Sequence, residues 1–450
     1  MLLGTQRINE RGHLEVGGCD TVELAREYGT PLYVMDEPAI RSACRAYRSA
    51  FESRYPANQI HYAGKAFLCL AMCKIAEQEG LGLDVAASGE LYTAIQAGFP
   101  MDRVNLHGNN KSADEIRMAL RHRVGHITVD NFTEIATLAS LLRGRRRSAA
   151  QAVLVRCAPG VDPETHRFMR TGQADTKFGF NIADGSALEA VRRVLEVPAM
   201  QFRGIHFHVG SQLTDTDSHE GAIEAAVELM ADIRAKAHAD CAVLNIGGGL
   251  GVRYVQGQQH LTIERFADRL VQALTEELTR HDLPKPILAQ EPGRAIVGEA
   301  GLTLYTVGAV KTVPIVGGEG RRTYASVDGG LSDNPRPQLY DAVYEAVCAS
   351  RASEPHERTI AVAGKHCETD VLIWEAKCPP LVPGDLIAVQ TTGAYNHSMA
   401  SNYNRVPRPA VALVGNGNSD LIVRRERLRD LTRRDLLPAR LAGASSGAAQ

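Results

Sequence analysis

The sequence has no long apolar run and almost no excess of charge of either sign. No apolar stretch approaches the roughly 20 residues that a membrane-spanning helix needs, and residues 1–12 are polar where a secretion signal needs an apolar core. With 50 basic and 52 acidic residues the net charge is −2, so we expect neither a membrane nor a nucleic acid as partner. The densest basic run, residues 143–147, is interpreted as a solvated loop.

The sequence also lacks the cysteine pattern of a disulfide-stabilised or zinc-binding protein. Its nine cysteines are an odd number without regular spacing, and a chain of 450 residues can bury a core large enough to be stable without cross-links. Cys69 and Cys73 are four residues apart, but no second pair lies nearby, which favours core packing over zinc. We therefore expect a cytoplasmic protein without a metal.

Short apolar segments alternate with helix-periodic segments between about residues 59 and 291. In residues 263–280, for example, large apolar side chains recur on one helical face. This alternation predicts βαβ units and a parallel sheet, and eight strands over this length favour an α/β fold, a (β/α)8 TIM barrel, with an open doubly wound sheet as the alternative. The eight predicted strands are residues 59–62, 82–85, 104–107, 126–129, 152–156, 202–208, 242–246 and 287–290.

After residue 291 the sequence becomes rich in β-strand patterns with glycine and proline between them. Residues 302–312, 323–327, 359–362, 371–373 and 386–391 predict a C-terminal antiparallel β domain, to which residues 31–35 add a strand. The expected domains are a barrel at 36–298 and a β-rich domain built from 1–35 and 299–440. Residues 441–450 are mostly Ala, Gly and Ser and are expected to be a disordered tail.

Polar residues follow several of the predicted strands, where a barrel collects its chemistry. Lys65 follows an apolar segment, and a lysine there is costly unless it is paired or used. Burial would lower the pKa of its amine and allow a Schiff base with a carbonyl, although a surface lysine is the simpler interpretation of Lys65 alone. The other strand-end residues are Asp84, His107, Arg156, His208, the glycines 247–249, Glu291 and Arg294.

Taken together, these residues combine an amine, a glycine loop, an aromatic face and a carboxylate, which are the parts needed to hold pyridoxal 5'-phosphate. Asp84 and Arg156 could equally form an internal ion pair. His107 and His206 are interpreted as core histidines. The pair His206 and His208 could bind a metal on one strand face, but no third ligand lies nearby in sequence.

The order of the motifs resembles the diaminopimelate decarboxylases, within the alanine-racemase-like (fold type III) enzymes that use pyridoxal phosphate. The resemblance covers residues 31–414, nearly the whole chain. The motifs that carry it are Tyr62-Ala63-Gly64-Lys65-Ala66, Ser88-Gly89-Glu90-Leu91, His107-Gly108-Asn109-Asn110-Lys111, Thr165-His166, Lys177-Phe178-Gly179-Phe180, His206-Phe207-His208-Val209-Gly210-Ser211-Gln212, Glu291-Pro292-Gly293-Arg294, Arg336-Pro337-Gln338-Leu339-Tyr340, Cys367-Glu368 and Gly393-Ala394-Tyr395.

The resemblance implies a function and a role for each matching residue. Lys65 would bind the cofactor covalently and Cys367 would return a proton after meso-2,6-diaminopimelate loses carbon dioxide to become L-lysine, the last step of lysine biosynthesis. It also implies a homodimer in which Cys367 and Glu368 reach the site of the second subunit. The implied cofactor-binding residues are Lys65, Asp84, His208, Ser211, Gly248, Gly249, Glu291, Gly293, Arg294 and Tyr395, and the implied substrate-binding residues are Arg294, Arg336, Tyr340, Glu368 and Tyr395.

Three departures from the family pattern concern the substrate. Cys367-Glu368-Thr369-Asp370 is one residue shorter than the usual Cys-Glu-Ser-Gly-Asp, Tyr344 stands where a histidine is common, and Ala87 where a serine is common. They leave open a sister decarboxylase acting on another amino acid, such as ornithine or arginine, or on an aminoacyl conjugate. An amino-acid racemase is disfavoured because nothing matches its second base, and a silent regulator because Lys65, Glu291 and Cys367 are all retained.

Overall fold

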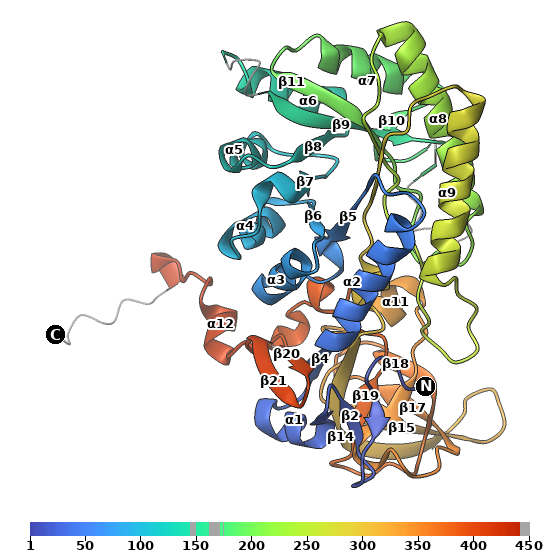
Figure 1. Ribbon diagram of the computed structural model, residues 1–450. Coiled ribbons are helices and arrows are strands. Elements are labelled where there is room, and N and C mark those ends of the chain that lie inside the picture. The colour runs from blue at the N-terminus through green and yellow to red at the C-terminus, as the bar shows by residue number, and fades with distance from the viewer. Residues whose placement is uncertain (145–149, 162–171, 174, 442–450) are drawn as a thin grey trace.

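The computed structural model describes residues 1–144, 150–161, 172–173 and 175–441 (Figure 1). The Thr165-His166 match, part of the basic run at 143–147 and all but the first residue of the expected tail at 441–450 lie outside the described residues. Among the described residues, no helix has the length and apolar character needed to cross a membrane.

Eight parallel strands close into a barrel, which confirms the predicted fold class. Their order is β9-β11-β12-β13-β5-β6-β7-β8, and β8 pairs in turn with β9 (Figure 1). This last pairing closes the sheet and excludes the open doubly wound alternative. All eight predicted strands are present, as β5 (Asn58–Ala63), β6 (Gly82–Val85), β7 (Val104–Leu106), β8 (His126–Val129), β9 (Gln151–Ala158), β11 (Met200–His206), β12 (Val243–Asn245) and β13 (Ile287–Gln290).

Helices surround the barrel because each has one apolar face to bury. In α9, Phe266, Leu270 and Leu274 are buried, as their spacing predicted. The helix α5 begins with a capping box, in which Ser112 accepts from the Glu115 amide and Glu115 accepts from the Ser112 amide. The barrel-side helices are α2 (Glu37–Glu52), α3 (Leu70–Gln78), α4 (Ser88–Gln96), α5 (Ala113–His122), α6 (Phe132–Leu141), α7 (Ser186–Leu195), α8 (Asp217–Ala237), α9 (Ile263–Arg280) and α10 (Arg294–Val297).

The second sheet is mixed and not purely antiparallel. Its order is β18-β17-β15-β14-β4-β20-β21, with β19 paired to β14 and β16. Most pairs are antiparallel as predicted, but β15 runs parallel to β17 and β4 runs parallel to β20. The strands are β4 (Leu32–Asp36), β14 (Gly301–Pro314), β15 (Arg321–Val327), β16 (Ala346–Cys348), β17 (Arg358–Ala363), β18 (Val371–Cys378), β19 (Leu386–Val389), β20 (Ala410–Gly415) and β21 (Asn418–Val423).

One strand from the N-terminal segment, β4, belongs to this second sheet, as expected from residues 31–35, and lies between β14 and β20. The three strands before it form a small sheet of their own. The chain then enters the barrel through α2, whose first turn is capped by the Asp36 side chain. The smaller elements are β1 (Arg7–Ile8), β2 (Leu14–Val16), β3 (Cys19–Asp20), α1 (Thr21–Tyr28), β10 (Phe180–Asn181), α11 (Arg336–Tyr340) and α12 (Leu428–Thr432).

Candidate active site

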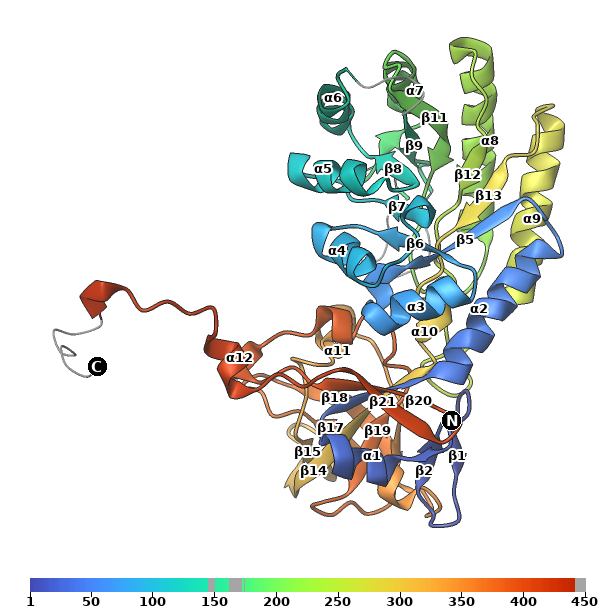
Figure 2. The same ribbon diagram turned by 60° about the vertical axis from the view of Figure 1, so that its left-hand side comes forward.

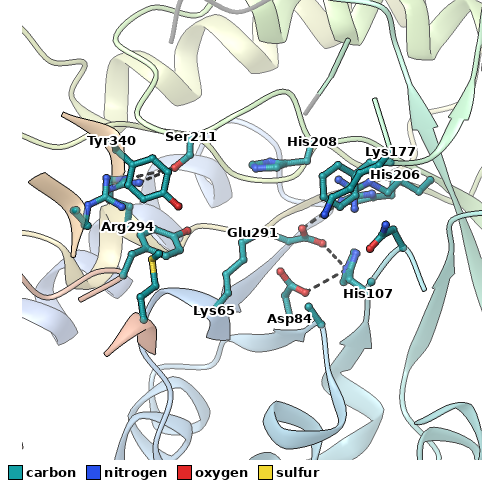
Figure 3. A pocket seen from close by; sticks show the side chains of 18 residues that line it. Lys65, Asp84, His107, Lys177, His206, His208, Ser211, Glu291, Arg294 and Tyr340 are labelled. Atoms are coloured by element: carbon teal, nitrogen blue, oxygen red, sulfur yellow. Dashed lines mark hydrogen bonds and ion pairs between the residues drawn. The ribbon is translucent and has the colours of Figure 1, made fainter. Parts of the chain in front are cut away.

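A cavity of about 390 Å³ opens where the carboxyl ends of the barrel strands face the second sheet (Figure 3). Most of its wall comes from the barrel, and four residues between 336 and 399 come from the β-rich region. Its lining consists of Lys65, Asp84, Ala86, His107, Gly108, Asn109, Arg156, Lys177, Phe178, His206, His208, Ser211, Glu291, Arg294, Arg336, Tyr340, Tyr395 and Met399.

Lys65 stands in a short 3-10 turn (Gly64–Ala66) directly after β5. Its side chain is accessible to solvent but projects into the cavity (Figure 3). Burial acts to lower the pKa of the amine, but Asp84, Tyr395 and Glu291 outweigh it and raise the pKa above its usual value. The expectation that burial lowers the pKa of Lys65 is therefore wrong for this pocket, because the sequence did not show which carboxylates surround it.

Glu291, which follows β13, is the centre of a buried polar network. Its Oε1 accepts a 2.6 Å hydrogen bond from the Asn245 side chain and lies 2.9 Å from His107 Nε2, while Oε2 lies 3.3 Å from His206 Nε2. Burial favours the neutral acid, but His107 and His206 override it and hold the pKa of Glu291 well below its usual value. Glu291 is thus an anion in the floor of the cavity.

Asp84 extends this network, because it approaches the same nitrogen of His107 as Glu291 does. Its Oδ1 lies 3.6 Å from His107 Nε2. Burial raises the pKa of Asp84 to about 6 although His107 and Lys65 oppose the change, and the two carboxylates raise the pKa of His107 despite its burial. The anticipated alternative, a pair between Asp84 and Arg156, is not formed; Arg156 lies 3.5 Å from Asp130 instead.

His107 and His206 are buried, as their interpretation as core histidines predicted, but they also line the candidate site. Both are buried, yet both line the cavity and contact Glu291. Sequence reasoning missed this because the three residues come from three different strands. One nitrogen of each histidine and a Glu291 oxygen lie within 4.8 Å of one another, a spacing that could hold a metal. His208, the other member of the pair considered from the sequence, does not belong to this group.

His208 lines the cavity, and the glycine loop 247–249 lies directly beside His208. Burial, together with the positive charges of Lys65 and Arg156, lowers the pKa of His208 well below its usual value, so its ring is neutral. The Gly248 amide lies 3.3 Å from His208 Nδ1 and donates to it. A Cβ on Gly248 would stand 2.2 Å from the Glu291 carbonyl, and Gly249 has φ +133°, so both positions require glycine.

Arginines and tyrosines occupy the end of the cavity nearest the second sheet. Arg294 donates to Ser211 Oγ at 3.1 Å, and its guanidinium lies 4.7 Å from the Tyr395 ring centre. Arg336 lies 5.0 Å from the Tyr340 ring. Tyr254 also accepts a hydrogen bond from Arg294, a contact that no motif in the sequence indicated.

Lys177 and Phe178 line the cavity beside Arg156, although the sequence gave them no individual role. The Phe178 ring lies 4.3 Å from the Arg156 guanidinium and 4.9 Å from Lys177 Nζ. Their only signal in the sequence was membership of a family motif. Lys177 and Arg156 thus place two positive charges around the Phe178 ring in the cavity wall.

Cys367 and Glu368 lie outside this cavity. Cys367 is the one exposed cysteine of the nine, and its amide donates to the Asn404 side chain at 3.1 Å. Glu368 accepts a 2.6 Å hydrogen bond from the Tyr403 hydroxyl. The buried Asp370 carboxylate accepts from the His366 and Leu331 amides and fixes the loop at its end. Cys367, the predicted proton donor, and Glu368, a predicted substrate-binding residue, are therefore both exposed on this chain.

The residues present fit pyridoxal phosphate. An amine, an ionised carboxylate and a neutral aromatic ring converge on one cavity, as Figure 3 shows for Lys65, Glu291 and His208. A second group of donors, Arg294 and Ser211, lies where a phosphate would be neutralised. The glycines at 248 and 249 keep side chains out of the adjoining backbone.

Comparisons with known proteins agree with this arrangement. Residues 38–298 match the family of pyridoxal-dependent decarboxylases, over its pyridoxal binding domain. The diaminopimelate decarboxylase of Bacillus subtilis (strain 168) is 47% identical over 97% of this chain and 98% of its own length. That of Halalkalibacterium halodurans is 45% identical, covering 96% of this chain and 97% of that protein. The crystal structure of the M. jannaschii enzyme with L-lysine superposes with a TM-score of 0.90 at 30% identity, covering 98% of this chain and 100% of that chain.

Fold and site together define a pyridoxal-dependent decarboxylase, a carboxy-lyase that uses pyridoxal phosphate. Within that class, the chain belongs to the diaminopimelate decarboxylase family.

Proposed function

We propose that this enzyme converts meso-2,6-diaminopimelate to L-lysine and carbon dioxide, as the last step of lysine biosynthesis. The observation that carries the proposal is the cavity in which Lys65, the anion Glu291 and several arginines, among them Arg294 and Arg336, converge. The chain is also 47% identical to a named diaminopimelate decarboxylase. When bound, pyridoxal 5'-phosphate supplies the electron sink that makes loss of carbon dioxide feasible.

The barrel residues hold and tune the cofactor. Lys65 is the covalent attachment point, and Asp84 and Glu291 surround its amine with negative charge. Glu291, whose carboxyl stays ionised, would favour a protonated ring nitrogen in the bound cofactor. The neutral His208 ring would pack against the cofactor ring. The residues that would hold its phosphate are Ser211, Gly248, Gly249, Gly293, Arg294 and Tyr395.

Substrate recognition falls to residues at the edge of the cavity and to the partner subunit. Arg294 and Arg336 offer guanidinium forks that match a carboxylate, and Tyr340 and Tyr395 line the same end. Glu368 binds the distal ammonium group of the substrate, and Cys367 returns a proton to the carbon that lost carbon dioxide. Both act from the second subunit of a cytoplasmic homodimer, which explains why they face outward here.

The sharing of sites is tested by mixing two inactive variants. Lys65→Ala removes the attachment point and Cys367→Ala the proton donor, so neither homodimer has a complete site. If sites are shared, mixed dimers contain one intact site, and roughly a quarter of native activity returns after subunit exchange. A mixture that stays inactive although mixed dimers form would contradict shared sites.

We also propose that the chain has two domains, a barrel at 36–298 and a β-rich domain built from 1–35 and 299–440. The pairing of β4 with β14 and β20 supports this division.

The function is tested by mass-spectrometric product analysis of the holoenzyme with diaminopimelate, ornithine, arginine and lysine in one competition. We expect lysine from diaminopimelate alone. A different amine, with none from diaminopimelate, would instead assign the chain to a sister decarboxylase.

The role of Glu368 is tested by Glu368→Gln. This variant should bind the cofactor normally but lose lysine formation, by roughly 100-fold or more in kcat/KM, because an amide cannot balance a buried ammonium. The matched control is Glu375→Gln, at an exposed glutamate on β18. Full activity of Glu368→Gln would refute the distal-ammonium role.

A further inference from the structure

The C-terminal arm, residues 424–441, is anchored at its start, where Arg425 donates to the Tyr28 and Pro31 carbonyls, and leaves the body of the molecule from α12 onward. Figures 1 and 2 both show the chain beyond α12 extending away from the body. Every residue from 432 to 441 is exposed. Among the described residues, the hydrogen bonds and ion pairs that tie 431–441 to the rest of the chain all come from Arg405, which donates to the Leu431 carbonyl at 2.9 Å and to the Asp435 carboxylate at 2.5 Å.

The arm exposes more apolar side chains than is usual for a solvent-exposed segment. Leu428 is 75% exposed, Leu436 91%, Leu437 70% and Leu441 59%. Four exposed leucines within 14 residues are unlike scattered surface side chains and mark a surface that another molecule covers. Among the described residues, these four leucine side chains are left exposed by the rest of the chain.

The arm is also basic, whereas the rest of the chain is acidic. Seven of the 50 basic residues and three of the 52 acidic residues lie in residues 424–441, so the remainder of the chain carries an excess of six acidic side chains. A second copy of this chain therefore presents an opposite net charge to the arm, which favours their encounter.

The residue that binds the arm belongs to a turn that also contacts the loop with Cys367 and Glu368, the loop that would enter the partner's site. Arg405, which holds the arm, belongs to the 3-10 turn Tyr403–Arg405. In the same turn, Tyr403 binds Glu368 and Asn404 binds the Cys367 amide. Whatever positions this turn against a second subunit therefore places the arm against that subunit as well.

We propose that the C-terminal arm docks on a second copy of this chain and holds the dimer in which Cys367 and Glu368 complete the partner's pocket. The inference rests on the proposed function, which places these two residues in the partner's site. The leucines supply apolar contact and the arginines supply charge complementarity. The exposed Leu70 and Tyr92, on α3 and α4, offer apolar side chains on the barrel side that such an arm can cover.

The first test compares truncations of the holoenzyme by sedimentation velocity over a range of concentrations. A chain ending at Thr432 and a full-length Leu436→Ser/Leu437→Ser variant should both show a dimer dissociation constant raised roughly tenfold or more. A chain ending at Leu441 keeps the whole arm and serves as the matched control, with an unchanged constant. Dimers as tight without the arm as with it would overturn the proposal.

The second test uses trypsin, which cleaves after Arg433 and Arg434. Docking on a second copy predicts that cleavage there slows as the concentration of the full-length protein rises through the dimer dissociation constant. Cleavage independent of protein concentration, or protection that appears only with added RNA or anionic vesicles, would overturn docking on a second copy.

The two proposals fail in different ways. If the arm is needed only for dimerisation, the chain ending at Thr432 regains lysine formation from diaminopimelate at high protein concentration. If the full-length chain makes no lysine at any concentration, the proposed function fails whatever the arm does.

Discussion

Single residues in this enzyme take their properties from neighbours that are remote in sequence. Glu291 stays ionised although it is buried, because His107, His206 and Asn245 converge on its two oxygens. Strand-end position was enough to select Lys65, Asp84, His208 and Glu291 from the sequence. It was not enough to place His107 and His206, because the contact between strands that decides their role is not a local property of the chain.

His107 should control the charge of Glu291. In a His107→Asn variant the carboxylate loses a charged partner, so its pKa rises and the acidic limb of the kcat profile moves to higher pH. We therefore expect kcat to be lower on the acidic side of the profile, falling roughly tenfold for each pH unit below the raised pKa. The control is His126→Asn, at a barrel histidine that does not line the cavity. An unchanged pH profile in His107→Asn would rule out this role.

At the scale of elements, patterns within one segment of the sequence predicted the secondary structure of that segment. Helical periodicity located α9, and short apolar runs located all eight barrel strands. The strands β16, β20 and β21 were missed, and the parallel pairs β15–β17 and β4–β20 could not be predicted. Pairing between distant segments depends on tertiary packing. The sequence of a strand such as β20 does not indicate which other strand it pairs with.

The neighbouring helices α4 and α5 differ at their N-caps, so adding a cap to one and removing it from the other should have opposite effects on stability. Ala87 occupies the N-cap position of α4 in an extended conformation but has no side-chain hydrogen bond, whereas Ser112 caps α5. Ala87→Ser should raise the free energy of unfolding by about 1 kcal/mol, and Ser112→Ala should lower it by about 1 kcal/mol. Urea unfolding of the holoenzyme measures both, and an Ala87→Ser variant that is no more stable would show that the missing cap is not limiting.

For the whole molecule, buried histidines set the response to acid. Burial lowers the pKa of His61, His126, His219 and His397 to about 4, and that of His206 to about 3. An unfolded histidine titrates near 6.5. Between pH 6.5 and pH 4 these histidines are therefore protonated in the unfolded chain but stay neutral in the folded chain. These groups therefore make stability fall as pH falls through this range.

Asp84 and Asp333 act in the opposite direction but are fewer. Burial raises their pKa values to about 6 and about 7, so they favour the folded state as pH falls toward 4. Burial also raises the pKa values of Glu90 and Asp130, but it lowers that of His208 as well, so histidines with lowered pKa values outnumber carboxyls with raised ones. We therefore expect net acid destabilisation below about pH 6.5.

A His61→Gln variant tests this balance. It removes one of these histidines, so the loss of unfolding free energy between pH 6 and 5 should be smaller by about 1.4 kcal/mol per pH unit. Urea unfolding at several pH values measures the slope, and His260→Gln, at an exposed histidine, is the control. A slope identical to that of the native enzyme would contradict the assignment.

The position of β4 in the sheet has a consequence for synthesis on the ribosome. Leu32 pairs with Ala410, which is made 378 positions later. At roughly 5–20 residues per second, that strand waits roughly 20–75 s before its second neighbour exists. Nascent chains stalled before residue 410 should therefore leave the first 36 residues open to protease, so the earliest part of the polypeptide is among the last to reach its native surroundings.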